Sequence, residues 1–547
     1  MTKASTQNHD SGEILDLVVI GGGPHALALL CRLLEQSPFS TMSDQDHQRY
    51  HHIRVSKSKP QSGRDIVRRC SPLLDVDRLK IKVIDANAKD GWIKAQCFFI
   101  LTHALRTFAK DESRECELQD ITACFDIGCR NCKKKKQRSH FIPNDRHQFF
   151  TPSASLFADF CSSLVDRYNL LEVLIEGIVT TIIPRLDRAT GSKYFIIKSF
   201  NKTSGSIETF SAKRVVAALG NANHARLPPW VHTIEKTHVP EKRIIHALEF
   251  IECLKQGVDH CVSECSGHND IVGKDLAELM AREEGEDVKL LVVGGGLTSA
   301  QLVSLAGNRG IKKVTLITRS KLKTSQFDLS LDWIGRNSNI QFAKFWSEPL
   351  ETRLAILRRA KNGGSVTPEY MKLLMQYQTD GWLKVKENLQ VRQANWGQSS
   401  PLGRPCWRVE FDDGKSRYFD VIWLGTGSVL DVTKEPCLSK VLEKAPIQVV
   451  GGLPALNEDL RWGDLELYMM SSYCGLSLGP TAGNLIGGRV TADRIASNLW
   501  SKWIKENHEL RGLSALKNAE KHKPDLSSLA TMTGSFENFW SVLVESE

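Results

Sequence analysis

The sequence predicts an α/β protein in which one strand-turn-helix unit occurs twice. Residues 15–20 are apolar except for Asp16, and the turn Gly21-Gly22-Gly23 and a helical pattern over residues 27–35 follow them. The same order recurs in the middle of the chain, where the apolar stretch that begins at Val288 leads into Gly294-Gly295-Gly296. A strand, a glycine turn and a helix in this order are typical of a Rossmann-like unit. We therefore expect two Rossmann-like dinucleotide-binding domains, the second inserted into the first.

The composition is that of a globular protein with several structural units. The chain has 547 residues, of which 41% are hydrophobic and 25% are charged, which excludes a disordered chain, a collagen-like repeat and a small disulfide scaffold. The formal net charge of +9 is modest for this length, so we expect no dedicated nucleic-acid binding. Glycines and polar residues interrupt the uncharged run of residues 290–307, so we expect no membrane span.

The N-terminal residues and the cysteines predict a cytoplasmic protein. Residues 1–13 are polar and lack the apolar region of a secretory signal. In a chain without that signal, the 14 cysteines indicate reduced thiols or metal ligands rather than a disulfide framework. The oligomeric state is not predicted.

Changes in composition along the chain predict its domain organisation. Two polar stretches without an apolar period, residues 39–78 and 110–147, are expected to be irregular insertions in the first domain. Around them, apolar patterns predict strands at residues 81–85, 194–199 and 214–219 and a helix at residues 154–168. The expected segments are a polar N-terminus (1–13), the first domain in two parts (14–284 and 414–504), the inserted domain (285–413) and a polar tail (505–547).

The first glycine turn has the pattern G-x-G-x-x-A. Gly21 matches the tight turn, Gly23 the place where the backbone approaches a pyrophosphate, and Ala26 the small residue that lets helix and strand pack. An acid that ends the second strand should bind the ribose, and Asp85 occupies that position. Asp85 lies further along the chain than usual, which requires residues 39–78 to loop out of the unit.

The second glycine turn is followed by a basic strand end. Gly294, Gly296 and Ser299 take the same three roles, and the next strand ends at Arg319 and Lys321 without an acid. Arg319 can pair with a 2′-phosphate and Lys321 adds a second positive charge, so NADPH is favoured over NADH. The alternative is that the turn is an ordinary tight loop and that the two basic residues are a solvated strand end.

Three stretches resemble one family. Pro24 follows the first glycine turn, Gly91-Trp92 comes shortly after the acidic strand end, and residues 420–427 are similar to an Asp-x3-Leu-Ala-Thr-Gly-Tyr signature, with Gly425 and Ser428 in place of alanine and tyrosine. In these stretches the chain resembles the single-component flavin-dependent N-hydroxylating monooxygenases, the lysine and ornithine N-monooxygenase group, and relatives such as the oxidative-stress-induced growth inhibitor proteins. The resemblance covers residues 14–38, 80–106, 149–230 and 285–500.

The resemblance implies that FAD binds the first domain and NADPH the second. NADPH would reduce FAD, and reduced flavin would capture O₂ as a C4a-(hydro)peroxide. One oxygen atom would then pass to a small-molecule substrate, and N-hydroxylation is one form that this transfer could take. Because the cofactor carries this chemistry, no essential acid or base is named. The resemblance and the first turn together predict FAD contacts at Gly21, Gly23, Pro24, Ala26, Asp85, Trp92, Thr426, Gly427, Gly479 and Asn484.

Several alternatives stay open at the level of the function. Ser428, and the absence of a proline soon after Arg106, depart from the family pattern and leave amino-acid N-hydroxylation open. The two insertions are compatible with a regulatory or interaction protein on a flavoprotein scaffold, and an NADPH-dependent flavin reductase is a further reading. A flavin disulfide reductase would need a cysteine pair beside the flavin, but Cys129-x-x-Cys132 lies in an insertion rich in lysine.

Other residues also have two readings each. Cys129 and Cys132 could hold zinc with further ligands, but a lone C-x-x-C is more often a pair of loop thiols, so no metal is predicted. The run of residues 133–136, all lysine, could be a localisation signal or a solvated insertion. His25 could contact FAD or face solvent, Trp92 could stack on the flavin or belong to a core, and Gly479 and Asn484 could present a helix N-terminus to the flavin or merely begin a helix.

Overall fold

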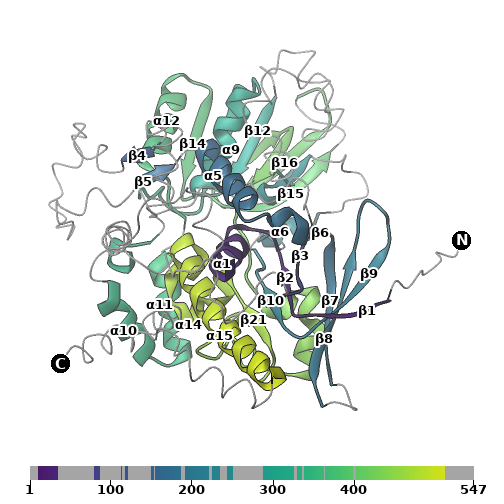
Figure 1. Ribbon diagram of the computed structural model, residues 1–547. Helices are drawn as coiled ribbons and strands as arrows, with labels where there is room; N and C mark the ends of the chain where they lie inside the picture. The colour runs from purple at the N-terminus through teal and green to yellow at the C-terminus, as the bar shows by residue number, and fades with distance from the viewer. Residues whose placement is uncertain are drawn as a thin grey trace, which may run out of the picture. The chain divides into compact units, whose positions relative to one another are not determined.

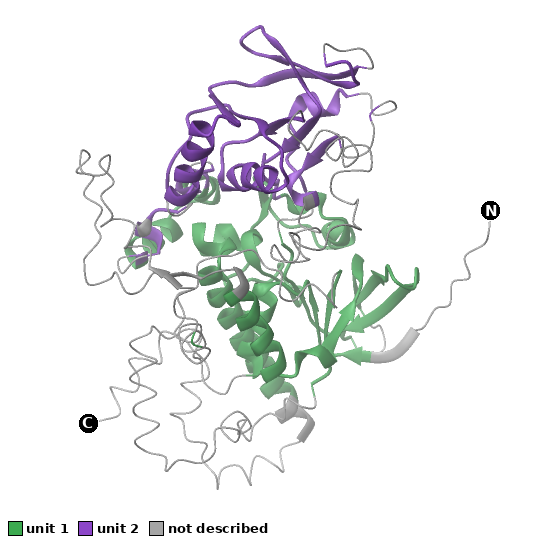
Figure 2. Ribbon diagram, turned by 90° about the horizontal axis from the view of Figure 1, so that it is seen from above, with its two compact units in different colours: residues 1–220, 339–357, 431–547 green, residues 221–338, 358–430 purple. Residues whose placement is uncertain are grey.

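A computed structural model describes residues 10–34, 79–86, 113, 118–120, 150–152, 154–186, 191–220, 224–234, 239, 243–250, 288–325, 329–334, 338–361, 364–397 and 402–511. The chain forms two compact units, coloured separately in Figure 2. Unit 1 comprises residues 1–220, 339–357 and 431–547, and unit 2 comprises residues 221–338 and 358–430. Each unit is described by itself.

Unit 1 is built on a parallel sheet with the strand order β21-β10-β2-β3-β6. The central strand β2 (Leu17–Ile20) is buried along its whole length, as expected for a strand covered on both faces. It pairs with β3 (Ile81–Asp85) on one side and with β10 (Val215–Ala217) on the other. The outer strands are β6 (Leu174–Glu176) and β21 (Leu467–Met469). The sequence order along this sheet is that of a Rossmann-like fold.

Helix α1 (Pro24–Leu34) packs against helix α15 (Leu485–Arg511), and the two ribbons lie side by side in Figure 1. Most of the α1 side chains are buried, including the charged Arg32. Arg32 Nε donates to Asp493 Oδ1 at 3.0 Å. Burial raises the pKa of Asp493, and the Arg32 charge opposes that shift. The pair therefore ties the N-terminal helix to residues more than four hundred positions away.

The expected strand over residues 15–20 is divided between two sheets. Strand β1 (Asp10–Leu15) pairs with β9 (Ile207–Ala212), and the sheet continues through β8 (Lys193–Phe200) to β7 (Ile178–Leu186). Asp16 separates β1 from β2, because its carboxylate accepts hydrogen bonds from Lys213 Nζ at 2.8 Å and from the Lys80 backbone N–H at 3.1 Å.

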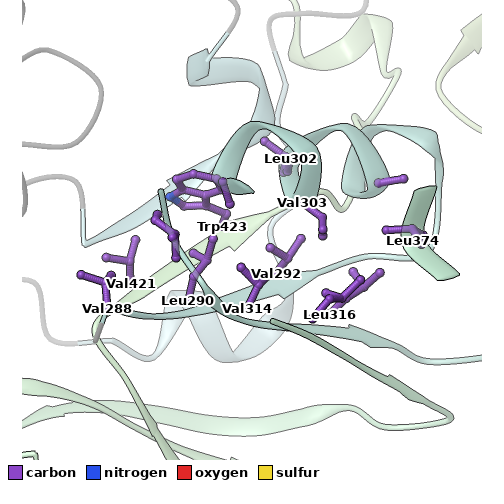
Figure 3. Packing of buried hydrophobic residues seen from close by; sticks show 14 of the residues in the cluster. Val288, Leu290, Val292, Leu302, Val303, Val314, Leu316, Leu374, Val421 and Trp423 are labelled. Carbon is purple, nitrogen blue, oxygen red and sulfur yellow. The ribbon is translucent and has the colours of Figure 1, made fainter. Parts of the chain in front are cut away.

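Unit 2 is built on a second parallel sheet with the strand order β11-β18-β12-β13-β14. Its strands are β11 (Ile244–His246), β12 (Lys289–Val293), β13 (Lys313–Thr318), β14 (Leu383–Glu387) and β18 (Val421–Leu424). Helices α9 (Leu297–Asn308) and α12 (Pro368–Thr379) contribute to its core, part of which Figure 3 shows. In that view Leu290, Val292 and Val314 lie beneath Leu302 and Val303 of α9.

The prediction of an α/β protein with two Rossmann-like parallel sheets is confirmed, and unit 2 lies within the sequence of unit 1. The limits of the units differ from those expected. Unit 2 begins at Asn221 rather than at residue 285, because β11 hydrogen-bonds to β18. It ends at Leu430 rather than at residue 413, because β18 pairs with β12 in the middle of the second sheet.

The remaining correction concerns residues 339–357, which belong to unit 1. They include most of α10 (Ser338–Ser347) and the first part of α11 (Leu350–Lys361). Arg353 donates to the backbone carbonyls of Trp346, at 2.5 Å, and Leu476, at 3.2 Å, while Trp346 Nε1 donates to that of Ser477 at 2.9 Å. These bonds fasten the helices to the segment that precedes Gly479.

Shorter elements complete the two units. A second sheet of unit 2 is antiparallel and contains β15 (Val391–Gly397), β16 (Cys406–Phe411) and β17 (Ser416–Phe419). The other elements are β4 (Leu118–Asp120), β5 (Phe150–Pro152), α5 (Ala154–Arg167), α6 (Pro229–His232), α13 (Ser439–Lys444), β19 (Val449–Val450), β20 (Leu453–Pro454) and α14 (Gly475–Leu478), with short 3-10 helices between them.

Some of the segments expected from the sequence differ in the structure, and others lie outside the described residues. Strand β4 pairs with β5, so part of the expected insertion 110–147 is regular. Helix α15 continues to Arg511, past the expected start of the tail at residue 505. The insertion 39–78, Trp92, the pair Cys129 and Cys132 and the lysine run 133–136 lie outside the described residues. Among the described helices, none combines the length and the apolar character needed to cross a bilayer.

Candidate functional site

The first glycine turn lies at the carboxyl end of β2, beside the carboxyl end of β10. Gly21 has φ +93°, and a Cβ there would lie 2.6 Å from the carbonyl oxygen of Ala218. Both facts require glycine at this position, because residues other than glycine rarely adopt a positive φ and no space is left for a methyl group. β2 and β10 are the neighbours at which the strand order of the sheet reverses, and this is where open α/β sheets bind ligands.

Gly23 differs from Gly21 in its surroundings. A Cβ built on Gly23 would have no atom of the described residues within 4 Å, so the packing of the described part of the chain does not require glycine there. The second glycine of this pattern is the one that faces a pyrophosphate. Pro24 begins α1, and Ala26 is fully buried, as the helix-packing position requires. The open side of Gly23 and the N-terminus of α1 together fit a dinucleotide diphosphate.

Asp85 ends β3 and reaches the same turn. Its Oδ2 accepts a hydrogen bond from the Gly22 backbone N–H at 2.7 Å. A Cβ on Gly22 would lie 3.2 Å from the Asp85 Cβ, so the strand end and the turn are in close contact. The parallel pairing of β2 with β3 places the intervening residues outside the two strands, which is the condition under which Asp85 could serve as the ribose-binding acid.

The start of α15 supplies another wall of the site in unit 1. Gly479 has φ +77°, and a Cβ there would lie 3.0 Å from the ring of Phe342. Asn484 caps α15, since its Oδ1 accepts from the Gly487 backbone N–H at 3.1 Å. A Cβ on Gly488 would lie 3.0 Å from the His25 ring, so the start of α15 touches the start of α1.

His25 is a residue whose role the sequence left open. Its ring packs on α15, and its Nδ1 is buried without a hydrogen-bond partner among the described residues. Burial lowers the pKa of His25 to about 4, and the backbone of Asn484 opposes the shift. The imidazole is therefore neutral at pH 7. The contact with Gly488, which no sequence pattern signals, joins the glycine turn to the helix start.

The second glycine turn has the same local geometry at the carboxyl end of β12. Gly294 has φ +147°, and a Cβ there would lie 2.3 Å from the carbonyl oxygen of Gly425, which follows β18. Ser299 is buried, and its hydroxyl donates to the same carbonyl at 3.3 Å. The turn again lies at the point where the strand order reverses, this time between β12 and β18.

Gly296, the second glycine of this turn, lies in contact with Gly364. A Cβ on Gly296 would lie 3.4 Å from the Gly364 Cα, and a Cβ on Gly364 would lie 2.9 Å from the Gly296 Cα. Gly296 caps α9, where a pyrophosphate would meet the helix N-terminus. The second turn therefore has a neighbouring segment against its second glycine, whereas no described residue lies within 4 Å of the Cβ position of Gly23 in the first turn.

Arg319 and Lys321 follow β13, as the sequence predicted, and both are exposed. Neither has a hydrogen bond or an ion pair within the described part of the chain. Glu387, at the end of the neighbouring strand β14, instead accepts from the Leu322 backbone N–H at 2.9 Å. The basic side chains are thus free to bind an anion beside the carboxyl edge of the sheet.

Residues 420–427, in which the resemblance predicts FAD contacts at Thr426 and Gly427, lie in unit 2. Asp420 is completely buried at the start of β18, where Arg404 Nε donates to it at 2.7 Å and the Lys289 backbone N–H at 2.8 Å. Thr426 Oγ1 donates to the Arg226 carbonyl at 2.5 Å, and the Gly427 carbonyl accepts from the Arg226 N–H at 2.9 Å. The aspartate therefore has a structural role, and FAD contact by Thr426 and Gly427 stays a prediction.

A metal centre is not formed by the described residues, which contain no group of three or more histidine, cysteine or acidic side chains suited to hold an ion. The described cysteines, Cys31, Cys161, Cys406, Cys437 and Cys474, are buried. Burial raises the pKa of Cys161 and of Cys437 to about 12, so neither is a reactive thiolate at neutral pH.

Comparisons with known proteins agree with the arrangement of the two parallel sheets. Neither a protein-family model nor a curated protein matches the sequence. Among solved structures, the ornithine N-hydroxylase of Kutzneria sp. 744 is similar with a TM-score of 0.56 and 14% identity over 90% of this chain and 100% of that one.

Two further enzymes have the same architecture. L-lysine 6-monooxygenase from Pseudomonas syringae is similar with a TM-score of 0.54 and 17% identity, over 89% of this chain and 99% of that one. The ornithine hydroxylase of Pseudomonas aeruginosa is similar with a TM-score of 0.54 and 13% identity, again over 89% of this chain and 99% of that one. The chain therefore has the fold of the flavin-dependent ornithine and lysine N-hydroxylating monooxygenases.

Proposed function

We propose that this protein is a FAD-dependent oxidoreductase of the monooxygenase class, which uses NADPH and O₂ to oxygenate a small-molecule substrate. The observation that carries the proposal is the first glycine turn. Gly21 needs its positive φ to approach Ala218, while the Cβ side of Gly23 is open. Of the two turns, this is the one that presents a free glycine and a helix N-terminus at the same point.

The residues around this turn would hold FAD in unit 1. The backbone N–H groups of the turn and the N-terminus of α1 would bind the diphosphate, Asp85 would bind the ribose, and the start of α15 at Asn484 would face the flavin. Once bound, FAD supplies hydride acceptance and oxygen activation. Trp92, Thr426 and Gly427 remain proposed contacts from the resemblance alone.

NADPH is the electron donor that we propose for unit 2. Support comes from Gly294 and Ser299, which form the turn, and from the exposed Arg319 and Lys321 at the strand end. The 2′-phosphate would pair with Arg319, whose planar guanidinium suits phosphate oxygens. In this conformation Gly364 lies against Gly296, where the diphosphate of NADPH would bind.

The substrate that we propose to test first is a small amine, with N-hydroxylation as the reaction. The structure of the Kutzneria enzyme contains reduced FAD, NADP⁺ and L-ornithine, and its similarity to this chain motivates the choice. We also propose a cytoplasmic location, with which the buried cysteines are compatible.

A second candidate function is a flavoprotein scaffold without turnover. The covered Gly296 favours it, because a chain that never admits NADPH would bind FAD and not reduce it.

Purified protein distinguishes the two candidates. The bound flavin is measured by its absorbance, NADPH is added without oxygen, and oxygen is then admitted in the presence and absence of ornithine, lysine or cadaverine. Bleaching by NADPH, followed by hydroxylamine formation from an amine, supports the monooxygenase. Bound flavin that NADPH does not bleach supports the scaffold, and protein that neither retains nor binds FAD contradicts both.

A further inference from the structure

We infer that residues 364–366, here called the cover segment, are an autoinhibitory plug in the dinucleotide seat of unit 2, which NADPH must displace in order to bind. The inference rests on the proposed function, since it concerns how that function is regulated. Its first support is the contact between two glycines. Gly364 and Gly296 approach so closely that a Cβ on Gly364 would lie 2.9 Å from the Gly296 Cα, so a side chain on Gly364 would prevent the contact.

The contact lies at the N-terminus of α9, where a diphosphate would bind. Gly296 is the N-cap of α9 and, as a glycine, has no side chain to occupy the space beside the helix N-terminus. The second glycine of a dinucleotide turn exists so that a pyrophosphate can come close at this point. Around the corresponding Gly23 of unit 1, no atom of the described residues lies within 4 Å of the Cβ position. The two turns of this chain thus differ at the place that a diphosphate needs.

The cover segment is held in place by its neighbours. The Val366 N–H donates to the Lys323 carbonyl at 2.8 Å, and the Val366 carbonyl accepts from the Ser325 N–H at 3.0 Å. Val366 is fully buried and belongs to the core of unit 2. Gly364 is exposed and lies two residues from this anchor. The anchor therefore keeps the plug beside the turn, while Gly364 itself lies at the surface.

The anchoring also connects the plug to the basic strand end. Residues 323–325, which pair with the cover segment, follow Arg319 and Lys321 directly in the sequence. The 2′-phosphate would bind to Arg319 and Lys321 beside this anchor, whereas the diphosphate would meet the plug itself. A closed state lowers the apparent affinity of a ligand by the fraction of molecules that are open. NADPH affinity is thus set by the plug as well as by direct contacts.

The experiment compares two ligands on the full-length, FAD-loaded protein. NADP⁺ carries the diphosphate, whereas 2′-AMP carries the 2′-phosphate and no diphosphate. The variant Gly364→Ala places a methyl group against Gly296 and should drive the cover segment away from the turn. We expect it to tighten NADP⁺ binding about tenfold, as for a plug closed in roughly nine molecules of ten, and to leave the dissociation constant of 2′-AMP unchanged.

A second measurement uses the wild-type protein, so that the result does not depend on the variant folding. With ¹⁵N-labelled glycine, the amide resonance of Gly364 should shift on addition of NADP⁺ and not on addition of 2′-AMP. Unchanged or weaker NADP⁺ binding in Gly364→Ala overturns the plug, as does a Gly364 resonance that ignores NADP⁺. Protein that retains FAD but binds neither ligand overturns both the plug and NADPH use, and the flavin content of the same sample reports separately on unit 1.

Discussion

The carboxylate of Asp85 accepts a hydrogen bond from the backbone N–H of Gly22 at 2.7 Å, although 63 positions separate the two residues. The bond joins the end of β3 to the turn after β2, and the two strands pair in parallel along their length. An acid at this place in a Rossmann-like sheet faces the ribose of a bound dinucleotide. The relationship therefore identifies Asp85 as the proposed ribose ligand despite its distance along the chain.

Replacement of Asp85 by alanine should weaken FAD binding. The variant loses a charged acceptor from the turn, and hydrogen bonds to charged groups contribute about 1.5–3 kcal/mol, so the dissociation constant of FAD should rise about ten- to hundredfold. It is measured by the quenching of flavin fluorescence on binding. Asp16→Ala is the control, because Asp16 binds Lys213 and Lys80 and, within the described residues, has no hydrogen bond to the turn. Equal FAD affinity in Asp85→Ala and the wild type would contradict the ribose assignment.

The two glycines of the first turn should respond differently to alanine. Gly21→Ala meets the Ala218 carbonyl and a positive φ, so it should lower the free energy of unfolding of unit 1 by at least about 1–3 kcal/mol. Gly23→Ala enters open space and should fold as the wild type does while its FAD binding falls sharply. Denaturant unfolding of the protein without FAD measures the free energy of unfolding of each variant, and a flavin titration measures its FAD affinity. A stable Gly23→Ala protein with normal FAD affinity would place the diphosphate elsewhere.

Removal of the basic side chains after β13 should change the choice of nucleotide. In Arg319→Ala combined with Lys321→Ala, the Michaelis constant for NADPH should rise about tenfold or more, since charge-assisted phosphate contacts are lost. The Michaelis constant for NADH should change little. Steady-state reduction of the flavin with each nucleotide gives both values. Lys384→Ala, an exposed lysine on β14, serves as the control, and equal effects on NADPH and NADH would refute the 2′-phosphate assignment.

Separation of the buried pair in unit 2 should destabilise that unit. Arg404 Nε lies 2.7 Å from Asp420 Oδ1, and Asp420 is completely buried. Arg404→Ala leaves an uncompensated buried carboxylate, which costs about 3–5 kcal/mol. The double variant with Asp420→Asn should recover part of that loss, because the buried charge is removed. Denaturant unfolding monitored by tryptophan fluorescence tests this, and additive losses in the double variant would argue against a direct interaction.

The buried histidine of the first turn should give the stability of unit 1 a pH dependence. The pKa of His25 falls from 6.5 to about 4 in the folded chain. Between these values the unfolded state binds the proton and the folded state does not, so the free energy of unfolding should decrease as the pH falls from about 6.5 to 4. His25→Asn does not titrate and should show a smaller decrease over that range. Parallel pH profiles for the two proteins would mean that His25 is not responsible.

The two glycine turns could be predicted from the sequence because their information is local. An apolar run, a glycine that must adopt positive φ and a helical pattern follow one another within a few residues, and Gly21 and Gly294 have the expected conformations. The order of the central strands follows from the same units. Asp85, Arg319 and Lys321 were found for a similar reason, since each ends or follows a recognisable strand.

Only the tertiary structure decided the assignment of β18 to unit 2, the contact of His25 with Gly488 and the covering of Gly296 by Gly364. A strand's sheet depends on which distant backbone provides its hydrogen bonds, and residues 421–424 are apolar enough for either sheet. A contact between two glycines leaves no pattern in the sequence, because neither has a side chain that could signal it. Local chemistry thus determined where nucleotide turns occur, and long-range packing determined which of them is open.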